Sequence, residues 1–207
     1  FYTLALEGDR VKKIYVNSEE SGPQKLSMNI YILKRELLID LVHTAFVRGY
    51  VYFERDILAH RLDKLNVKAY RFDGYLARIT DMKSYFDENM KLLEDENLDA
   101  LFNPNPIYTK IRDDNPTRYI NGSKVKNVMA ADGCIIEGEV ENSVLFRGVK
   151  IAKGAKVRNC VLMQDTVVEA NAELDCVVTD KNVKITAGKK LSGTESFPVY
   201  VQKKHTV

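Results

Sequence analysis

The stretch from Val128 to Val167, VMAADGCIIEGEVENSVLFRGVKIAKGAKVRNCVLMQDTV, returns to an apolar residue at every sixth position. The first series consists of Val128, Cys134, Val140 and Phe146, and it resumes after a one-residue slip at Ile151, Val157 and Met163. A companion series with the same spacing consists of Val149, Ala155, Val161 and Val167. A six-residue period is one flat side of a three-sided coil, and about eighteen residues complete a turn. The stretch therefore predicts a left-handed parallel β-helix of hexapeptide repeats.

The charged residue Glu169 tests the register of this repeat. Its position would be interior if the period continued unbroken, and an unpaired carboxylate is costly to bury. The apolar pattern reappears one place early at Ala172 and Leu174, which predicts a second slip that moves the charge out of the core. Val183 and Ile185 then resume the pair. We expect the β-helix over residues 120–207, since a stack of antiparallel hairpins would not explain the period of six.

Residues 1–102 follow a different pattern, in which short apolar strands alternate with helical segments. Strands are expected at 2–6, 11–16, 27–33 and 67–72, with a hairpin turn at 7–10. The spacing of apolar residues predicts a helix from Glu36 that Gly49 ends, a shorter helix over 54–64, and a helix capped by Asp81. This order is typical of the latter part of an α/β sheet domain. Prolines at 104, 106 and 116 predict a linker over 103–119.

Composition disfavours several classes of function. The net charge of +2 gives no reason to expect nucleic acid as a partner, and no apolar run approaches the roughly 20 residues that span a bilayer. The scattered cysteines predict buried thiols in a reducing cytoplasm rather than disulfides or a zinc site; they are Cys134, Cys160 and Cys176. The histidines also stand far apart, and we predict no metal site. Without a histidine between Arg61 and Lys204, the base of a hexapeptide acyltransferase is missing.

Five segments carry a family resemblance. They are Ser27–Tyr31 (SMNIY), Tyr52–Asp56 (YFERD), Tyr70–Tyr75 (YRFDGY), Ser84–Met90 (SYFDENM) and Gly138–Leu145 (GEVENSVL). In this order they resemble the SMGIY, DFGxD, AYxFxGYW, SYxxANM and GxVxNSVL segments of the bacterial glucose-1-phosphate adenylyltransferases, or ADP-glucose pyrophosphorylases. The resemblance implies that residues 1–102 are the C-terminal part of a Rossmann-like nucleotidyltransferase domain. It also implies that Ser27 contacts the glucose moiety of the substrate.

Three departures from the family's motifs bear on catalysis. The family segment FVEKP has a glutamate that binds glucose and a lysine that holds the sugar phosphate, and this chain has Asn17 and Ser18 at those positions. The family segment GYWxDVGT supplies an aspartate to the catalytic metal, and this chain has Arg78 there. The glycine-rich nucleotide loop of the family has no counterpart in these 207 residues. Active members need Mg²⁺; we expect no cofactor in this chain and assign it no catalytic residue.

The combination resembles the regulatory, catalytically impaired subunit of glycogen biosynthesis that pairs with a catalytic adenylyltransferase. We therefore expect a cytoplasmic protein that forms a hetero- or homo-oligomer, modulates ADP-glucose synthesis and responds to a sugar-phosphate effector. One alternative is an active adenylyltransferase that makes ADP-glucose from ATP and glucose 1-phosphate. It would need a substitute cation near Ser18, for which Lys12 and Lys25 are the nearest in sequence. The other alternative is a scaffold unrelated to glycogen.

Overall fold

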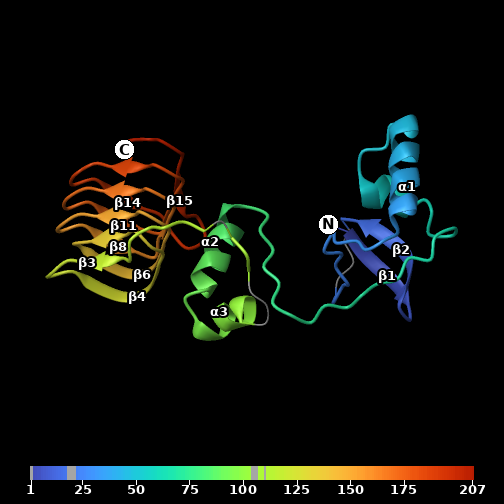
Figure 1. Cartoon of the computed structure of the whole chain (residues 1–207), viewed down its shortest axis with the longest axis horizontal. Coiled ribbons are helices and arrows are strands. Elements are labelled where there is room, and N and C mark those ends of the chain that lie inside the picture. The colour runs from blue at the N-terminus through green and yellow to red at the C-terminus, as the bar shows by residue number, and fades with distance from the viewer. Residues whose placement is uncertain (1, 18–21, 104–106, 110) are drawn as a thin grey trace. The chain divides into compact units, whose positions relative to one another are not determined.

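The computed structural model describes residues 2–17, 22–103, 107–109 and 111–207 (Figure 1). Contacts divide the chain into two compact units, Phe1–Asp73 and Gly74–Val207.

Short parallel strands make up most of the second unit. They are β3 (Arg118–Tyr119), β4 (Lys124–Ala130), β5 (Ile135–Ile136), β6 (Glu139–Leu145), β7 (Lys150–Ile151), β8 (Lys156–Arg158), β9 (Val161–Leu162), β10 (Val167–Val168), β11 (Glu173–Asp175), β12 (Val177–Thr179), β13 (Lys184–Ile185), β14 (Lys190–Ser192) and β15 (Val199–Val201). One sheet has the order β13–β10–β7–β5–β3. The other has the order β14–β11–β8–β6–β9–β12–β15, with β4 beside β6. The stacked strands of Figure 1 are the parallel β-helix that the repeat predicted.

The β-helix has three faces. The laddered face consists of β8, β11, β14 and the first halves of β4 and β6. At Asn142, where φ is 47°, β6 turns a corner into the helix-covered face, which continues through β9, β12 and β15. The open face consists of β3, β5, β7, β10 and β13. From β6 to β14 the partners in successive coils are 17 residues apart, as for Val140 and Val157, so these coils have one side of five residues. The last step, from Val177 to Val199, is 22 residues.

The prediction of the interior was correct at most positions. The predicted residues that are buried in the main core are Cys134, Val140, Val149, Ile151, Ala155, Val157, Ala172, Leu174, Val183 and Ile185. The charge of Glu169 lies outside this core, as predicted, where its Oε1 is 2.7 Å from Nζ of Lys184. The three cysteines are buried free thiols, and burial raises the pKa of Cys160 well above its usual range.

The prediction was wrong by one residue where the short side of each coil begins. Leu145 is in the core in place of Phe146 and Leu162 in place of Met163, one residue earlier than predicted in both cases, whereas Val168 is in the core one residue after the predicted Val167. The slip recurs in the coils from β6 to β12 and comes earlier in the coil than the sequence pattern indicated. Both residues of each pair are apolar, so the sequence pattern alone does not distinguish them.

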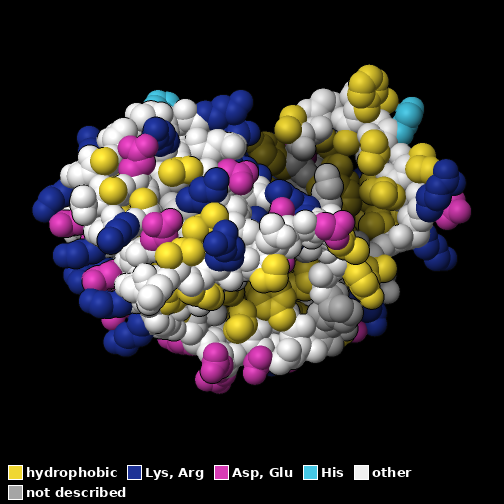
Figure 2. All heavy atoms as spheres, turned by 60° about the vertical axis from the view of Figure 1, so that its left-hand side comes forward, with side chains coloured by type: hydrophobic (Ala, Val, Ile, Leu, Met, Phe, Trp, Pro, Cys, Tyr) yellow, Lys and Arg dark blue, Asp and Glu magenta, His cyan; other side chains and the backbone are white. Residues whose placement is uncertain are grey.

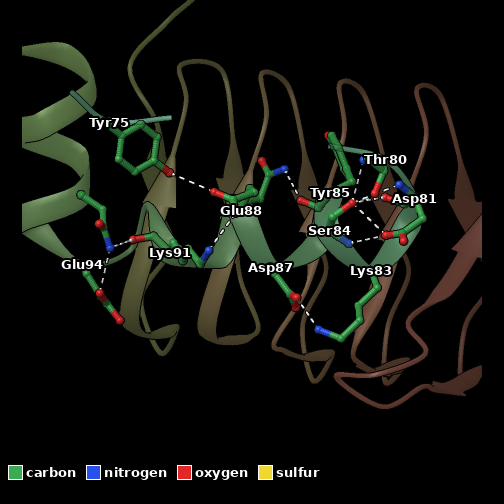
Figure 3. Close-up of polar contacts among 12 residues, drawn as sticks. Tyr75, Thr80, Asp81, Lys83, Ser84, Tyr85, Asp87, Glu88, Lys91 and Glu94 are labelled. Atoms are coloured by element: carbon green, nitrogen blue, oxygen red, sulfur yellow. Dashed lines mark hydrogen bonds and ion pairs between the residues drawn. The ribbon is translucent and has the colours of Figure 1, made fainter. Parts of the chain in front are cut away.

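Helices α2 (Met82–Lys91) and α3 (Asp95–Phe102) also belong to the second unit. Asp81 caps α2, as predicted. Its Oδ1 accepts a hydrogen bond from the backbone N–H of Ser84 at 2.7 Å, and the Ser84 hydroxyl accepts from the N–H of Asp81 at 3.0 Å (Figure 3). Lys83 pairs with Asp87 on the exposed side of the helix. These local bonds start the helix and define its polar side.

The apolar side of α2 packs on the β-helix. Phe86, only 3% exposed, forms a cluster with Val144, Val161 and Val178 of the helix-covered face. Val161, which we predicted inside the coil, is therefore buried between α2 and the coils. Residues 74–102 were predicted to belong to the first domain, whereas the compact units divide at Asp73. The difference arises because this cluster ties α2 to the coils.

The first unit contains an antiparallel hairpin and two helical segments. They are β1 (Tyr2–Glu7), β2 (Arg10–Val16), α1 (Arg35–Arg48) and a short π-helix η1 (Phe53–Leu58). The hairpin was predicted, and so was the end of α1 at Gly49, whose φ is 67°. The predicted helix over 54–64 is shorter than expected, since η1 ends at Leu58 and turns follow it.

Two predicted strands of this unit do not form. In the segment 27–33 the backbone turns at Asn29, whose φ of 57° cannot continue a strand. Only Leu26, just before it, makes an isolated bridge, to Thr3. The segment 67–72 is likewise reduced to an isolated bridge between Arg10 and Lys68.

Candidate functional site

Ser27, the residue expected to contact glucose, lies in a loop that docks on β1. The N–H of Leu4 donates to the carbonyl of Lys25, and the N–H of Ser27 donates to the carbonyl of Tyr2, both at 2.9 Å. After these bonds the chain turns at Asn29 in the left-handed region, which asparagine tolerates better than most residues. The turn brings the polar side chains of this loop to η1.

The Ser27 hydroxyl is bonded on two sides. It donates to Oε1 of Glu54, and it accepts from the backbone N–H of Asn29 at 3.3 Å. The Asn29 amide, with its nitrogen toward the carboxylate, donates to Oε2 of Glu54 at 2.8 Å. Glu54 is only 4% exposed, although its side chain is an acid. The bonds therefore join the loop to the first turn of η1.

Tyr31 completes this group. Its ring centroid lies 5.0 Å from that of Phe53, the residue before Glu54. Burial, followed by the hydrogen bond and the charge of Glu54, raises the pKa of the Tyr31 hydroxyl well above its usual range. The hydroxyl is therefore a neutral donor beside the carboxylate. We refer to Ser27, Asn29, Tyr31 and Glu54 as the Glu54 cluster.

Asp56, the other acid of the YFERD segment, has a local structural role. Its Oδ2 accepts hydrogen bonds from the backbone N–H groups of Val51 at 3.0 Å and Tyr52 at 2.9 Å, just before η1. Arg55, whose Nε lies 2.6 Å from Oδ1 of Asp56, is the main cause that holds the pKa of this carboxyl well below its usual range. The segment that resembles DFGxD thus uses its aspartate to shape the start of η1.

The degenerate family positions belong to different compact units. Asn17 follows β2 with a φ of 50° and belongs to the first unit, as does Ser27. Ser18 lies outside the described residues. Arg78 is exposed and belongs to the second unit. Within the described ranges, no three His, Cys, Asp or Glu side chains gather closely enough to hold a metal ion.

The laddered face carries two rows of alternating charge, in register across the strands. One row is Lys124, Glu139, Lys156, Glu173 and Lys190, and the other is Lys126, Glu141, Arg158 and Asp175. Nζ of Lys124 lies 2.8 Å from Oε1 of Glu139, and Nζ of Lys190 lies 3.0 Å from Oε2 of Glu173. These lysines hold the pKa of Glu139 and of Glu173 below its usual range. Figure 2 shows basic and acidic side chains interleaved over the β-helix.

A stack of asparagines runs along the corner between the laddered and helix-covered faces. Nδ2 of Asn127 donates to Oδ1 of Asn142 at 2.9 Å, and Nδ2 of Asn142 donates to Oδ1 of Asn159 at 2.7 Å. Asn159 donates to Asp175 at 2.9 Å. Cys176, with a φ of 50°, takes the corner position in the next coil. This stack was not predicted, although the asparagines recur at about the spacing of the coils.

The open face is less polar on its outer side. Val167 is half-buried there between the exposed Lys150 and Lys184, and Ile135 is half-buried between Lys150 and Arg118. A shallow groove runs over them and includes Ala152 among its lining residues. Apolar and charged side chains therefore alternate on this face, where Lys184 pairs with Glu169.

Glu54 was not predicted as a site residue, although its position in the family segment gave an indication. Glu54 stands at the glycine of the DFGxD segment, and Asn29 stands at the glycine of SMGIY. Polar side chains at both glycine positions indicate a contact between Asn29 and Glu54 only when the two segments are known to lie side by side. The structure supplies that information, because Ser27, two residues before Asn29, donates a hydrogen bond to Glu54.

Comparisons with known proteins agree with the motifs. A family model described as GlmU-like, C-terminal hexapeptide matches residues 111–195. Glycogen biosynthesis protein GlgD of Bacillus subtilis (strain 168) is 37% identical over 178 residues, which cover 86% of this chain and 52% of that protein. GlgD of Geobacillus stearothermophilus is 42% identical over 132 residues, or 63% of this chain and 38% of that protein. Glucose-1-phosphate adenylyltransferase of Thermomicrobium roseum is 35% identical over 185 residues, which cover 85% of this chain and 42% of that protein.

The chain spans about half the length of these relatives, or less. Among the helices in the described part of the chain, none has the length and apolar character needed to cross a membrane.

Proposed function

Because the chain belongs to the family of the glucose-1-phosphate adenylyltransferases and of glycogen biosynthesis protein GlgD, we propose that it is a regulatory subunit of glycogen biosynthesis whose own catalysis is impaired. It assembles with a catalytic adenylyltransferase subunit in the cytoplasm and modulates ADP-glucose synthesis. The relatives support this proposal, since they include proteins named as adenylyltransferases and proteins named only for glycogen biosynthesis.

Arg78 is the observation that carries the proposal. It stands where the resemblance expects the aspartate that binds the catalytic metal. Two unit charges 4 Å apart interact by about 4 kcal/mol at an effective dielectric near 20, and Mg²⁺ carries two charges. Mg²⁺ also requires oxygen ligands. A guanidinium at the position of this metal ligand would therefore repel Mg²⁺ instead of binding it.

The position of Ser18 supports the same conclusion. The resemblance expects a lysine there that holds the sugar phosphate. A hydrogen bond assisted by such a charge contributes about 1.5–3 kcal/mol, and a serine supplies no charge. The chain therefore lacks two of the charged groups on which the family's reaction depends.

We propose the open face of the β-helix as the surface for assembly. The charges of the laddered face are already paired, and taking paired charges out of water is costly. The helix-covered face already packs on α2. On the open face, Ile135 and Val167 lie among lysines, and such a mixture of apolar and charged groups is typical of interfaces between subunits that also exist apart. A sugar-phosphate effector would act on the assembled protein.

An assay of ADP-glucose synthesis by the full-length protein tests the loss of catalysis. We expect no significant turnover by the wild type, and a measurable gain in the double variant Ser18→Lys and Arg78→Asp. Lys203→Asp is the matched control, since it also reverses a charge but at an exposed position in the last coil. Wild-type turnover comparable to that of a catalytic subunit would contradict the proposal and favour the active adenylyltransferase.

A further inference from the structure

We propose that Glu54 closes the sugar site of this chain from within, by occupying the hydrogen bonds that Ser27 would offer to a ligand. The inference rests on the proposed function for its ligand class, a hexose phosphate such as glucose 1-phosphate. The closure itself rests on the geometry of the Glu54 cluster. It makes Glu54 a residue that prevents binding, in addition to the losses at Ser18 and Arg78.

The hydroxyl of Ser27 has no free hydrogen to donate to a ligand. A serine hydroxyl has one hydrogen to donate and two lone pairs that accept. Its hydrogen goes to Oε1 of Glu54, and one lone pair accepts from the backbone N–H of Asn29 at 3.3 Å. Ser27 can therefore donate to a sugar oxygen only after it has left the carboxylate.

Leaving the carboxylate is unfavourable, because the bond is assisted by charge. Hydrogen bonds to an ionised acceptor are about twice as strong as neutral ones. Glu54 is 4% exposed, so the loss of a donor would leave part of a carboxylate buried without compensation. The Asn29 amide occupies the other oxygen of the same carboxylate at 2.8 Å. A sugar oxygen that accepted a hydrogen bond from Ser27 would therefore have to displace the carboxylate of Glu54.

The negative charge adds a second barrier. A carboxylate beside Ser27 repels a phosphate group within several ångströms, and water screens this repulsion poorly where the acid is buried. Asn29 and Glu54 are also the residues that stand at the glycines of the SMGIY and DFGxD segments. The φ of 57° at Asn29 is one that a glycine adopts without strain. The two side chains thus fill space that glycines would leave empty, and they are bonded to each other.

Saturation-transfer NMR with glucose 1-phosphate on the full-length protein tests the closure. We expect a weak signal from the wild type and at least a roughly fivefold stronger signal from Glu54→Ala, the gain that one freed hydrogen bond would give. Adding Ser27→Ala to Glu54→Ala should return the signal to the wild-type level. Glu88→Ala, which removes an acid from α2, is the matched control and should change nothing.

Asn29→Gly is a second variant that keeps the test decisive if Glu54→Ala does not fold. Glycine accepts the backbone of position 29, and loss of the amide should give a smaller gain of the same sign. A wild type that binds well and loses binding in Glu54→Ala would overturn the inference, because Glu54 would then be part of an open site. A gain that persists without Ser27 would overturn it as well.

The same variants separate this inference from the proposed function. Stimulation of a catalytic subunit by the wild type tests the regulatory proposal without reference to sugar binding. If the wild type gives no stimulation at all, the regulatory proposal fails. The binding data still decide whether Glu54 closes the site.

Discussion

Replacement of Phe86 by alanine should release α2 from the β-helix. The Phe86 side chain is 3% exposed and packs against Val144, Val161 and Val178. Removal of a buried phenylalanine side chain costs about 3–5 kcal/mol. We expect a value near the lower limit, about 3 kcal/mol, because α2 covers the outside of the coils and can adjust more freely than a residue in their interior. At 1.4 kcal/mol for each factor of ten, the population of the open state should rise about a hundredfold.

Native-state hydrogen exchange on the full-length protein measures this change directly. The amides of α2 should lose about a hundredfold in protection, while those of β9 and β12 keep most of theirs, because the main core lies on the other side of these strands. Phe197→Ala is the matched control, since Phe197 is 81% exposed and its loss should change stability by less than about 0.5 kcal/mol. A change of less than about threefold in α2 would refute the argument that this cluster holds the helix on the coils.

The charge reversal Lys156→Glu would place three acids side by side in successive strands, and it should lower the melting temperature by an amount that shrinks in 1 M salt; a loss that salt does not change would contradict the ladder as its cause. The pKa values of Glu139 and Glu173 are lowered in the fold, so their contribution to stability is present above the unfolded pKa of about 4.3 and is lost as the pH falls through the lowered folded values. The melting temperature should therefore fall more steeply below about pH 4 in the wild type than in the variant with both residues changed to glutamine, and equal slopes would count against this. Cys176→Asn should raise the melting temperature slightly, because asparagine adopts a φ of 50° more readily than cysteine and continues the stack from Asn159; a lower melting temperature would show that the corner has no room for the amide.

The β-helix was predictable because its physical cause repeats in the sequence. Each flat side of a coil buries one or two side chains, and the period of these residues can be read without knowing any contact. The position of the short side was not predictable. Leu145 and Phe146 are both apolar, and only the packing of the strands decides which of them points inward. A charge such as Glu169 marks a slip because it cannot be buried alone, and there the prediction was confirmed.

The candidate site was less predictable, because it depends on contacts between distant segments. The apolar letters of SMNIYIL indicated a strand, and the turn at Asn29 is explained by the hydrogen bonds of this loop to Glu54. The helical pattern of α2 was visible in the sequence, but its partner on the β-helix was not, since Phe86 and Val161 are far apart in the chain. Local capping by Asp81, which involves only neighbouring residues, was predicted correctly.

The central claim is that this chain acts through a catalytic partner rather than by its own chemistry. The most direct test is a titration of the full-length protein into a fixed amount of the catalytic adenylyltransferase subunit from the same cell, with the initial rate of ADP-glucose formation as the measurement. We expect the rate to rise above that of the catalytic subunit alone and to saturate at a fixed ratio of the two chains. A rate that does not change, or one that only adds the turnover of the titrated protein measured by itself, would contradict the claim.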